Sequence, residues 1–261
     1  MKKLKKTFVF VIFSMLSFAA MSQLTADAQH SLSRSFASDG IEQVASTNVS
    51  GNIIVTGTSG NDVLINIYVH SLNGKKDILS PAEIERRINT NYSIVFEVDN
   101  QKLIASIHQK TKEIDWKNQL VLSLEIQLPA HLPVELEAPA GNIYLKNIAG
   151  KAIISSESGN FYISQVNAEI SGKTSGGNIY IDNSGSNIYL KTNGGNIAAA
   201  DCKGNLQLFT EGGMITLAHL QGKIEARTTG GKIKGKNISG EFIAYEKGQL
   251  ASITAINYGR K

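Results

Sequence analysis

Between residues 141 and 248, apolar and polar positions recur with a period of eighteen residues over six consecutive segments. Each segment begins with glycine, and these glycines are Gly141, Gly159, Gly177, Gly195, Gly213 and Gly231. With that glycine counted as column one, apolar side chains fill columns three and five and, less strictly, columns twelve and fourteen. Apolar residues two apart are typical of a strand with one buried face, because successive side chains point to opposite sides. Each segment, or rung, is therefore predicted to hold two short strands.

A fixed period of this length predicts a solenoid, in which a single rung cannot bury its apolar face and must stack on its neighbours. Rungs about 4.8 Å apart would form a rod with two parallel sheets around a thin aliphatic core. Parallel crossovers are almost always right-handed, so we expect an all-β fold, a right-handed parallel β-solenoid of six rungs over residues 141–261. We also expect the glycine-rich corners to use positive φ angles.

Two other solenoids with repeats of this kind do not fit the pattern. A hexapeptide helix needs an apolar residue every six positions, which these columns do not provide. A calcium-binding roll needs aspartate in its glycine turns, whereas these turns carry asparagine and lysine.

Residues 29–140 are predicted to form a β-rich cap with an early rung and one short helix. Residues 51–55 repeat the Gly-Asn-Ile opening of the later rungs. Ser80, Pro81 and Glu83 have the spacing of a capping box, which predicts a helix over residues 81–89. Alternating apolar residues then predict strands at 92–98, 102–108 and 120–128.

The two ends of the rod raise separate expectations. Pro129, Pro133 and Pro139 predict an extended, poorly hydrogen-bonded passage into the regular rungs. The cap would cover the first open end, whose strand edge could otherwise bind another molecule. At the other end the period slips at Gly248, and the chain finishes with an incomplete coil, which is either frayed or covered by a partner. Self-association at the solenoid ends is therefore one expectation.

The charge of the chain points to export. Its formal net charge of +4 arises largely from four lysines within the first six residues. These lysines precede an apolar run at residues 8–20, which is too short to span a bilayer and is typical of a secretory signal peptide. Two cleavage sites fit, after Ser22 and after Ala28, and we prefer the second, which makes residues 1–28 the signal peptide. The expected location is the periplasm, the cell surface or the extracellular space.

Removing residues 1–28 leaves 22 basic and 21 acidic residues. A nucleic-acid-binding role then loses its main support, which was the basic charge. No other stretch is long and apolar enough to be a transmembrane segment. The single cysteine, Cys202, lies in a largely apolar column and is expected to be buried rather than reactive.

Several of these features together resemble the bacterial family of β-strand-repeat putative adhesins. The resemblance rests on the early rung at residues 51–55, the helix start at Pro81, the proline-rich passage at 128–133 and the half-rungs that begin with Gly, Asn or Asp, and Ile. It covers nearly all of the chain after residue 28 and implies an exported solenoid. The family supplies no catalytic or binding residues to carry over.

Three outward columns are candidate binding features. Column four places Tyr144, Tyr162 and Tyr180 on successive rungs, and Tyr189 follows in column thirteen of the third rung. Such tyrosines could bind sugar rings or a partner surface, or they could stabilise the sheet through cross-strand contacts. Column two holds Asn142, Asn160, Asn178 and Asn196, which we interpret as a structural hydrogen-bonded ladder.

The third feature is basic. Lys232, Lys234 and Lys236 alternate along one strand, with Lys223 and Arg227 on the preceding rung. This patch could bind lipopolysaccharide or another polyanion, or it could protect a strand near the open end from aggregation.

The sequence gives little support for catalysis. Carboxylates rarely share a column on adjacent rungs, and the nearest approach is Glu225 with Glu241, which we interpret as solvated surface. The five histidines have no metal-ligand spacing, and no cofactor is implied. We therefore expect a non-enzymatic cell-envelope protein with adhesin-like binding of a cell-surface glycan or an envelope protein. A structural or assembly protein is the alternative, and a polysaccharide-cleaving enzyme comes third.

Overall fold

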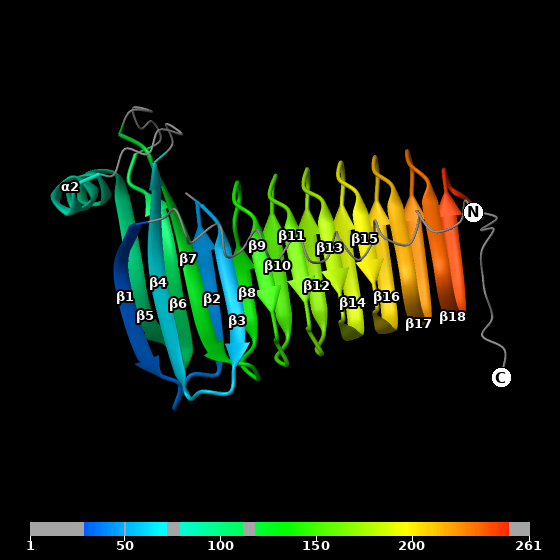
Figure 1. The fold of residues 1–261 in the computed structure, drawn as a ribbon, viewed down its shortest axis with the longest axis horizontal. Coiled ribbons are helices and arrows are strands. Elements are labelled where there is room, and N and C mark those ends of the chain that lie inside the picture. Colours follow the sequence, from blue (N-terminus) through cyan, green and yellow to red (C-terminus); the bar gives the residue numbers. More distant parts are fainter. Residues whose placement is uncertain (1–28, 50, 72–78, 112–117, 251–261) are drawn as a thin grey trace, which may run out of the picture.

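The computed structural model describes residues 29–49, 51–71, 79–111 and 118–250. The expected signal peptide and the residues of the incomplete last coil after Leu250 lie outside the described residues. The chain forms a rod of stacked parallel coils, with antiparallel strands and a helix at the N-terminal end (Figure 1). This architecture confirms the predicted all-β solenoid with an N-terminal cap.

Each rung contributes one strand to each of two sheets, which we call sheet 1 and sheet 2. Sheet 1 contains β9 (Ile143–Lys146), β11 (Phe161–Ser164), β13 (Ile179–Asp182), β15 (Ile197–Ala200) and the first parts of β17 (Ile215–Thr228) and β18 (Ile233–Glu246). Sheet 2 contains β8 (Val134–Glu137), β10 (Ala152–Ser156), β12 (Ile170–Thr174), β14 (Gly185–Thr192), β16 (Lys203–Thr210), the later parts of β17 and β18, and β19 (Gln249–Leu250).

The register between rungs is eighteen residues throughout. Ile179 pairs with Phe161 on one side and with Ile197 on the other, and all three side chains are buried. The core is a continuous column of such apolar residues between the two sheets. Strands β17 and β18 continue through the corner from sheet 1 to sheet 2. The two sheets are therefore joined into one continuous hydrogen-bonded sheet.

The cap extends both sheets toward the N-terminus. Sheet 1 continues through β3 (Ile53–Thr58), β7 (Leu120–Pro129), β4 (Asp62–Ser71) and β1 (Gln29–Ala37). Sheet 2 continues through β2 (Gln43–Asn48), β6 (Lys102–Gln109) and β5 (Tyr92–Asp99). Ile53 pairs in parallel with Ile143, so the early rung expected at residues 51–55 stacks directly on the first regular rung.

The proline-rich passage contains the expected extended segment, but the prediction that this segment is poorly hydrogen-bonded is wrong. Residues Val134–Glu137 form β8, which pairs in parallel with β2 and with β10. The Val134 N–H donates to the carbonyl oxygen of Lys151 at 2.8 Å. The passage is well hydrogen-bonded because the prolines lie outside the four strand residues, where no ladder N–H is required.

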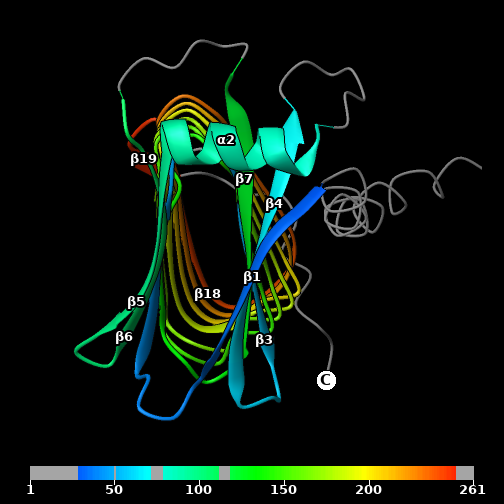
Figure 2. The same cartoon turned by 90° about the vertical axis from the view of Figure 1, so that its left-hand side faces the viewer.

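Helix α2 (Pro81–Asn91) crosses the N-terminal end of the rod (Figure 2). Ser80 caps it, and its hydroxyl accepts a hydrogen bond from the Glu83 N–H at 3.2 Å. The Glu83 carboxylate pairs with Arg86 and Arg87 at 2.8 and 2.6 Å. The capping Ser was thus predicted correctly, while the acidic side chain serves ion pairs along the helix.

The glycines at the corners have two different roles. None of the six column-one glycines has a positive φ angle. A Cβ atom on Gly159 would lie 1.8 Å from the carbonyl oxygen of Gly141, so glycine is required by the close approach of stacked backbones. Positive φ angles occur in column seven, at Asn147, Gln165, Asn183, Asp201, His219 and Asn237, and also, as expected for glycine corners, at the column-ten glycines Gly204, Gly222 and Gly240.

Two polar ladders run along the corner beside these glycines. In the asparagine ladder, the Asn160 N–H and side-chain amide donate to Oδ1 of Asn142 at 2.9 and 3.1 Å. This confirms the structural interpretation of column two. A second ladder consists of buried threonines, each of which donates to one glycine carbonyl and accepts from another glycine N–H; they are Thr174, Thr192, Thr210 and Thr228.

Candidate functional site

The even columns of sheet 1 and the odd columns of sheet 2 form two outer surfaces on opposite sides of the core. On sheet 1, column four is a single row of paired residues from rung to rung. The row comprises Tyr144, Tyr162, Tyr180, Ala198, Thr216 and Lys234. We call its first three members the tyrosine strip.

The tyrosine strip is a stack of rings. The Tyr144 and Tyr162 ring centroids are 4.7 Å apart with 9° between planes, and those of Tyr162 and Tyr180 are 5.1 Å apart with 16°. Tyr144 lies between Ile54 and Tyr162 and is only 4 % exposed, so the expectation that all three rings are exposed is wrong. Because the rings turn their faces toward one another, Tyr162 offers a ligand its ring edge.

Burial changes the acidity of the strip. It raises the pKa of Tyr144 to about 12, with a smaller contribution from neighbouring Tyr162. Burial also raises the pKa of Tyr162 and of Tyr180 above the ordinary tyrosine value. All three phenols are therefore neutral at physiological pH and can take part in hydrogen bonds as donors and acceptors.

Lys232, Lys234 and Lys236, which we call the lysine triplet, lie on the same outer surface at the other end of the solenoid. All three side chains are exposed, and none has an ion-pair partner within the described residues. Lys223 and Arg227 do not join them, because both lie on sheet 2, where they pair with Glu241 and Glu225 respectively. The basic patch is thus smaller than the sequence suggested, but it is not neutralised by acidic neighbours in this part of the chain.

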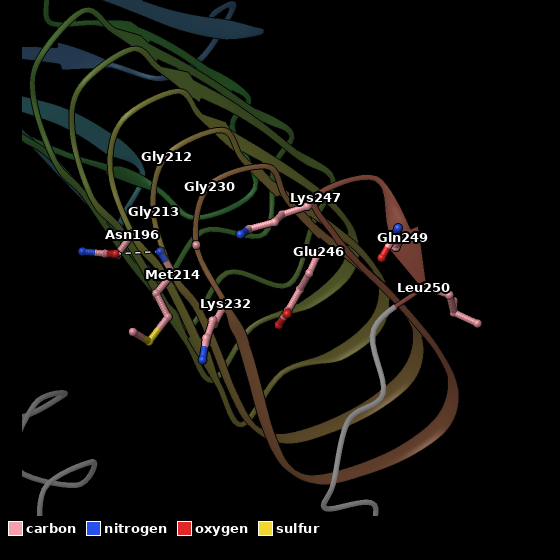
Figure 3. A pocket seen from close by; sticks show the side chains of 11 residues that line it. Asn196, Gly212, Gly213, Met214, Gly230, Lys232, Glu246, Lys247, Gln249 and Leu250 are labelled. Atoms are coloured by element: carbon pink, nitrogen blue, oxygen red, sulfur yellow. Dashed lines mark hydrogen bonds between the residues drawn. The ribbon is translucent and has the colours of Figure 1, made fainter.

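A hollow of about 660 Å³ adjoins the lysine triplet at the corner of the last rungs. Asn196, Met214, Lys232, Glu246 and Lys247 contribute side chains to its wall (Figure 3). The asparagine ladder ends here, where Oδ1 of Asn196 accepts from the Met214 N–H at 2.8 Å. Oε1 of Glu246 accepts a hydrogen bond from the Ile233 N–H at 2.6 Å, so this carboxylate already has a backbone partner within the last rung.

Tyr189 lies apart from the strip, on the outer surface of sheet 2. Its ring centroid is 5.5 Å from that of Phe209, and Nζ of Lys173 lies 5.8 Å from its centroid. Cζ of Arg227 lies over two further rings, 5.8 Å from the centroid of Phe209 and 4.6 Å from that of Tyr245. Tyr189 was a candidate from the sequence, whereas Phe209 and Tyr245 were not, because these two aromatic residues of column fifteen lie two rungs apart and form no continuous row.

A shallow hollow of about 300 Å³ lies beside Tyr189. Its polar lining residues come from three consecutive rungs and are Glu169, Ser171, Asn187, Asn205 and Gln207. Glu169 pairs with Lys151 at 2.8 Å, whereas the three amides have no hydrogen-bond partner within the described residues.

The remaining candidates carry little chemistry. In the described part of the chain, no three His, Cys, Asp or Glu residues are placed to hold a metal ion. Glu225 and Glu241 were the nearest pair of carboxylates expected from the sequence. Each forms an ion pair, Glu225 with Arg227 and Glu241 with Lys223. Cys202 is buried as expected, and burial raises its pKa to about 12. Across the described ranges, no helix combines the length and apolarity that a bilayer crossing requires.

Comparison with known proteins finds no matching family model and no matching curated protein. One solved structure, a "putative cell adhesion protein" from Clostridium sporogenes, aligns over 84% of this chain and 98% of its own, at 12% identity and a TM-score of 0.33. A "putative lipid binding protein" from Parabacteroides distasonis aligns over 84% of this chain and 94% of its own, at 10% identity and a TM-score of 0.29. The resemblance to the β-strand-repeat family stays an expectation from sequence motifs, and neither neighbour's described role is carried over to this chain.

Proposed function

We propose that this chain is an exported, non-enzymatic protein of the bacterial envelope that binds an acidic cell-surface glycan along the outer surface of sheet 1. The observation that carries the proposal is the single row of column four, which has the tyrosine strip at one end and Lys234 at the other. Tyr180 and Lys234 are three rungs apart, or about 14 Å. A ligand that contacts both must therefore be extended along the rod.

The chemistry of the row suits a glycan with acidic groups. Neutral phenols and asparagine amides can exchange hydrogen bonds with sugar hydroxyls, which are both donors and acceptors. On the two rungs between the tyrosine strip and the lysine triplet, column four holds the small side chains of Ala198 and Thr216. No large side chain of this row therefore separates the two ends. The lysine triplet would attract carboxylate, sulfate or phosphate groups and accelerate their encounter with the surface.

The binding test uses polygalacturonate and its neutral methyl ester as probes. Changing the lysine triplet to glutamine should weaken binding to polygalacturonate about tenfold or more at low salt, because three attractive charges are lost. The control changes Lys191, Lys203 and Lys223 to glutamine, which removes the same charge from sheet 2. Equal loss in both variants, or unchanged binding in the triplet variant, would contradict the proposal.

The tyrosine strip is tested separately. Replacing Tyr162 and Tyr180 with serine should weaken binding to the same polymer while circular dichroism shows that the fold persists. Unchanged binding would exclude the strip from the site. Selective capture of an envelope protein, with no binding to any acidic glycan, would replace the glycan with a protein partner.

The proposed location rests on the signal-like sequence of residues 1–28. Protease treatment of intact cells, compared with fractionation into periplasm, membrane and cytoplasm, tests it. The expected result is protein outside the cytoplasm and lacking its first residues. Full-length protein retained in the cytoplasm would contradict export.

A structural or assembly role is the second candidate, and one observation favours it. Within the described residues, strand β18 pairs with β17 along its length but with β19 only at Tyr245 and Glu246. Most of its outer edge could therefore accept a strand from another molecule. Sedimentation at increasing concentration should then reveal larger species, and a strictly monomeric protein would contradict this role.

A further inference from the structure

The outer surface of sheet 2 has a feature that the proposed function does not use. The hollow of about 300 Å³ beside Tyr189 brings one aromatic ring, three side-chain amides and one carboxylate together on a rigid sheet. We infer that this hollow is a binding site for a neutral pyranose ring of a glycan. The site is independent of the lysine triplet, because the two surfaces lie on opposite sides of the core.

The position of each group follows from the strand register. Asn187 pairs with Asn205 and Tyr189 pairs with Gln207, so three amides and one aromatic ring lie together on two adjacent rungs. Asn187 and Tyr189 are two residues apart on β14, which places them on the same side about 7 Å apart. A single sugar ring can therefore contact the amides of column eleven and the ring of column thirteen together.

Tyr189 offers more to a ligand than the tyrosine strip does. Its partner on the preceding rung is Ser171, whose small side chain leaves space where the strip would have another ring. An aromatic ring beside such a space can pack against the apolar C–H face of a sugar. Phe209, on the following rung, and Lys173, two residues after Ser171, contact the ring without lining the hollow.

The amides define the chemical class of the ligand. Asn187, Asn205 and Gln207 have no hydrogen-bond partners within the described residues, and an amide can both donate to and accept from a sugar hydroxyl. The Glu169 carboxylate is balanced by Lys151 at 2.8 Å, so the lining offers mainly neutral hydrogen-bonding groups. A volume of about 300 Å³ is at the lower end of small-molecule sites and suits one ring rather than a large ligand.

A peptide fits this surface less well than a sugar. Peptides that bind sheets do so mainly by adding a strand at an edge, where backbone groups are unpaired. Here the neighbouring strands β12 and β16 already pair with β14 on both sides. Recognition at this hollow must therefore come from side chains, and these have the polarity that sugar hydroxyls require.

The test measures mobility of the purified protein in native gels that contain a soluble neutral glucan, mannan or galactan. At least one of these polymers should retard the protein. Tyr189→Ala should weaken that binding about tenfold, because the stacking surface is lost, whereas Tyr189→Phe should bind nearly as well as the unchanged protein. Tyr245→Ala is the matched control, since it removes a tyrosine from the same sheet outside the hollow.

A second variant separates binding from folding. Ser171→Tyr places a ring opposite Tyr189 in the arrangement that Tyr144 and Tyr162 already adopt, so it should fill the hollow without lowering the melting temperature. Binding to the neutral polymer should be lost in this variant. Binding of acidic polymers alone, or neutral-polymer binding that survives both Tyr189→Ala and Ser171→Tyr, would overturn the inference. Loss of neutral binding in the lysine-triplet variant would also overturn it, because the two sites would then be one.

Discussion

Gly177 stacks so closely on Gly159 that a Cβ atom on Gly177 would lie 1.9 Å from the Gly159 carbonyl oxygen. The preceding residue, Gly176, is less confined, and a Cβ atom there would come no closer than 3.6 Å to a neighbour. Neither glycine has a positive φ angle. The two positions therefore differ in the space that a side chain would have, and at neither does a positive φ angle require glycine.

Gly177→Ala should destabilise the protein strongly, by about 3 kcal/mol or more, because backbone atoms of two rungs would have to separate. Gly176→Ala should change stability by less than ~1 kcal/mol, since alanine fits there and also reduces the freedom of the unfolded chain. Urea denaturation of both variants checks the prediction. Similar denaturation midpoints for the two variants would contradict the prediction, because they would show that the rungs can move apart with little loss of stability.

The buried phenol of Tyr144 predicts a loss of stability in alkali. Its pKa is raised from 10.0 to about 12, mainly by burial, so the folded state holds this proton more tightly than the unfolded chain. The resulting stabilisation is complete below pH 10 and is lost as the pH rises toward 12. Tyr144→Phe keeps the ring but has no proton to lose, so its melting temperature should fall less over this range. Parallel curves for the two proteins would contradict the prediction.

The repeat could be predicted from the sequence because each column has a simple physical requirement. Ile179 and Ile197 must both face the core, and the period of eighteen residues brings them into register. The helix cap at Ser80 could be predicted for a similar reason, because its hydroxyl oxygen needs only the N–H of Glu83, three residues later. Such requirements act within one rung or one turn and are visible in a single chain segment.

The parts that were missed depend on contacts between segments far apart in the sequence. Residues 134–137 have no rung glycine, yet they form a strand because β2 and β10 lie on both sides of them. Column four gives no sign that Tyr144 is buried, because its neighbour Ile54 comes from a strand 90 residues earlier. The hollow beside Tyr189 combines residues of three rungs whose columns do not conserve one chemical type.

The hydroxyl groups of the buried threonine ladder should contribute to folding stability in addition to the apolar contacts of these side chains. Thr192 donates to the Gly177 carbonyl oxygen at 2.8 Å and accepts from the Gly195 N–H at 3.1 Å. Thr192→Val has nearly the same shape but leaves both backbone groups without that partner, which should cost about 1–3 kcal/mol. Thr216→Val, on the outer surface of sheet 1, should cost less than ~0.5 kcal/mol. Equal denaturation midpoints for the two variants would show that the hydroxyl is dispensable.

Cys202 should react with thiol reagents only when the rung around it unfolds. Its side chain is 2 % exposed, its sulfur lies 3.1 Å from the Ala200 carbonyl oxygen, and burial raises its pKa to about 12. Since the thiolate is the reactive form, both access and ionisation are suppressed near neutral pH. An aromatic disulfide reagent should therefore label the folded protein far more slowly than the urea-unfolded chain. Ser175→Cys, at an exposed corner, supplies a positive control in the same fold. Labelling of native Cys202 as fast as that control would mean that the fourth rung opens readily, and the solenoid core would then be much less rigid at this point than its packing indicates.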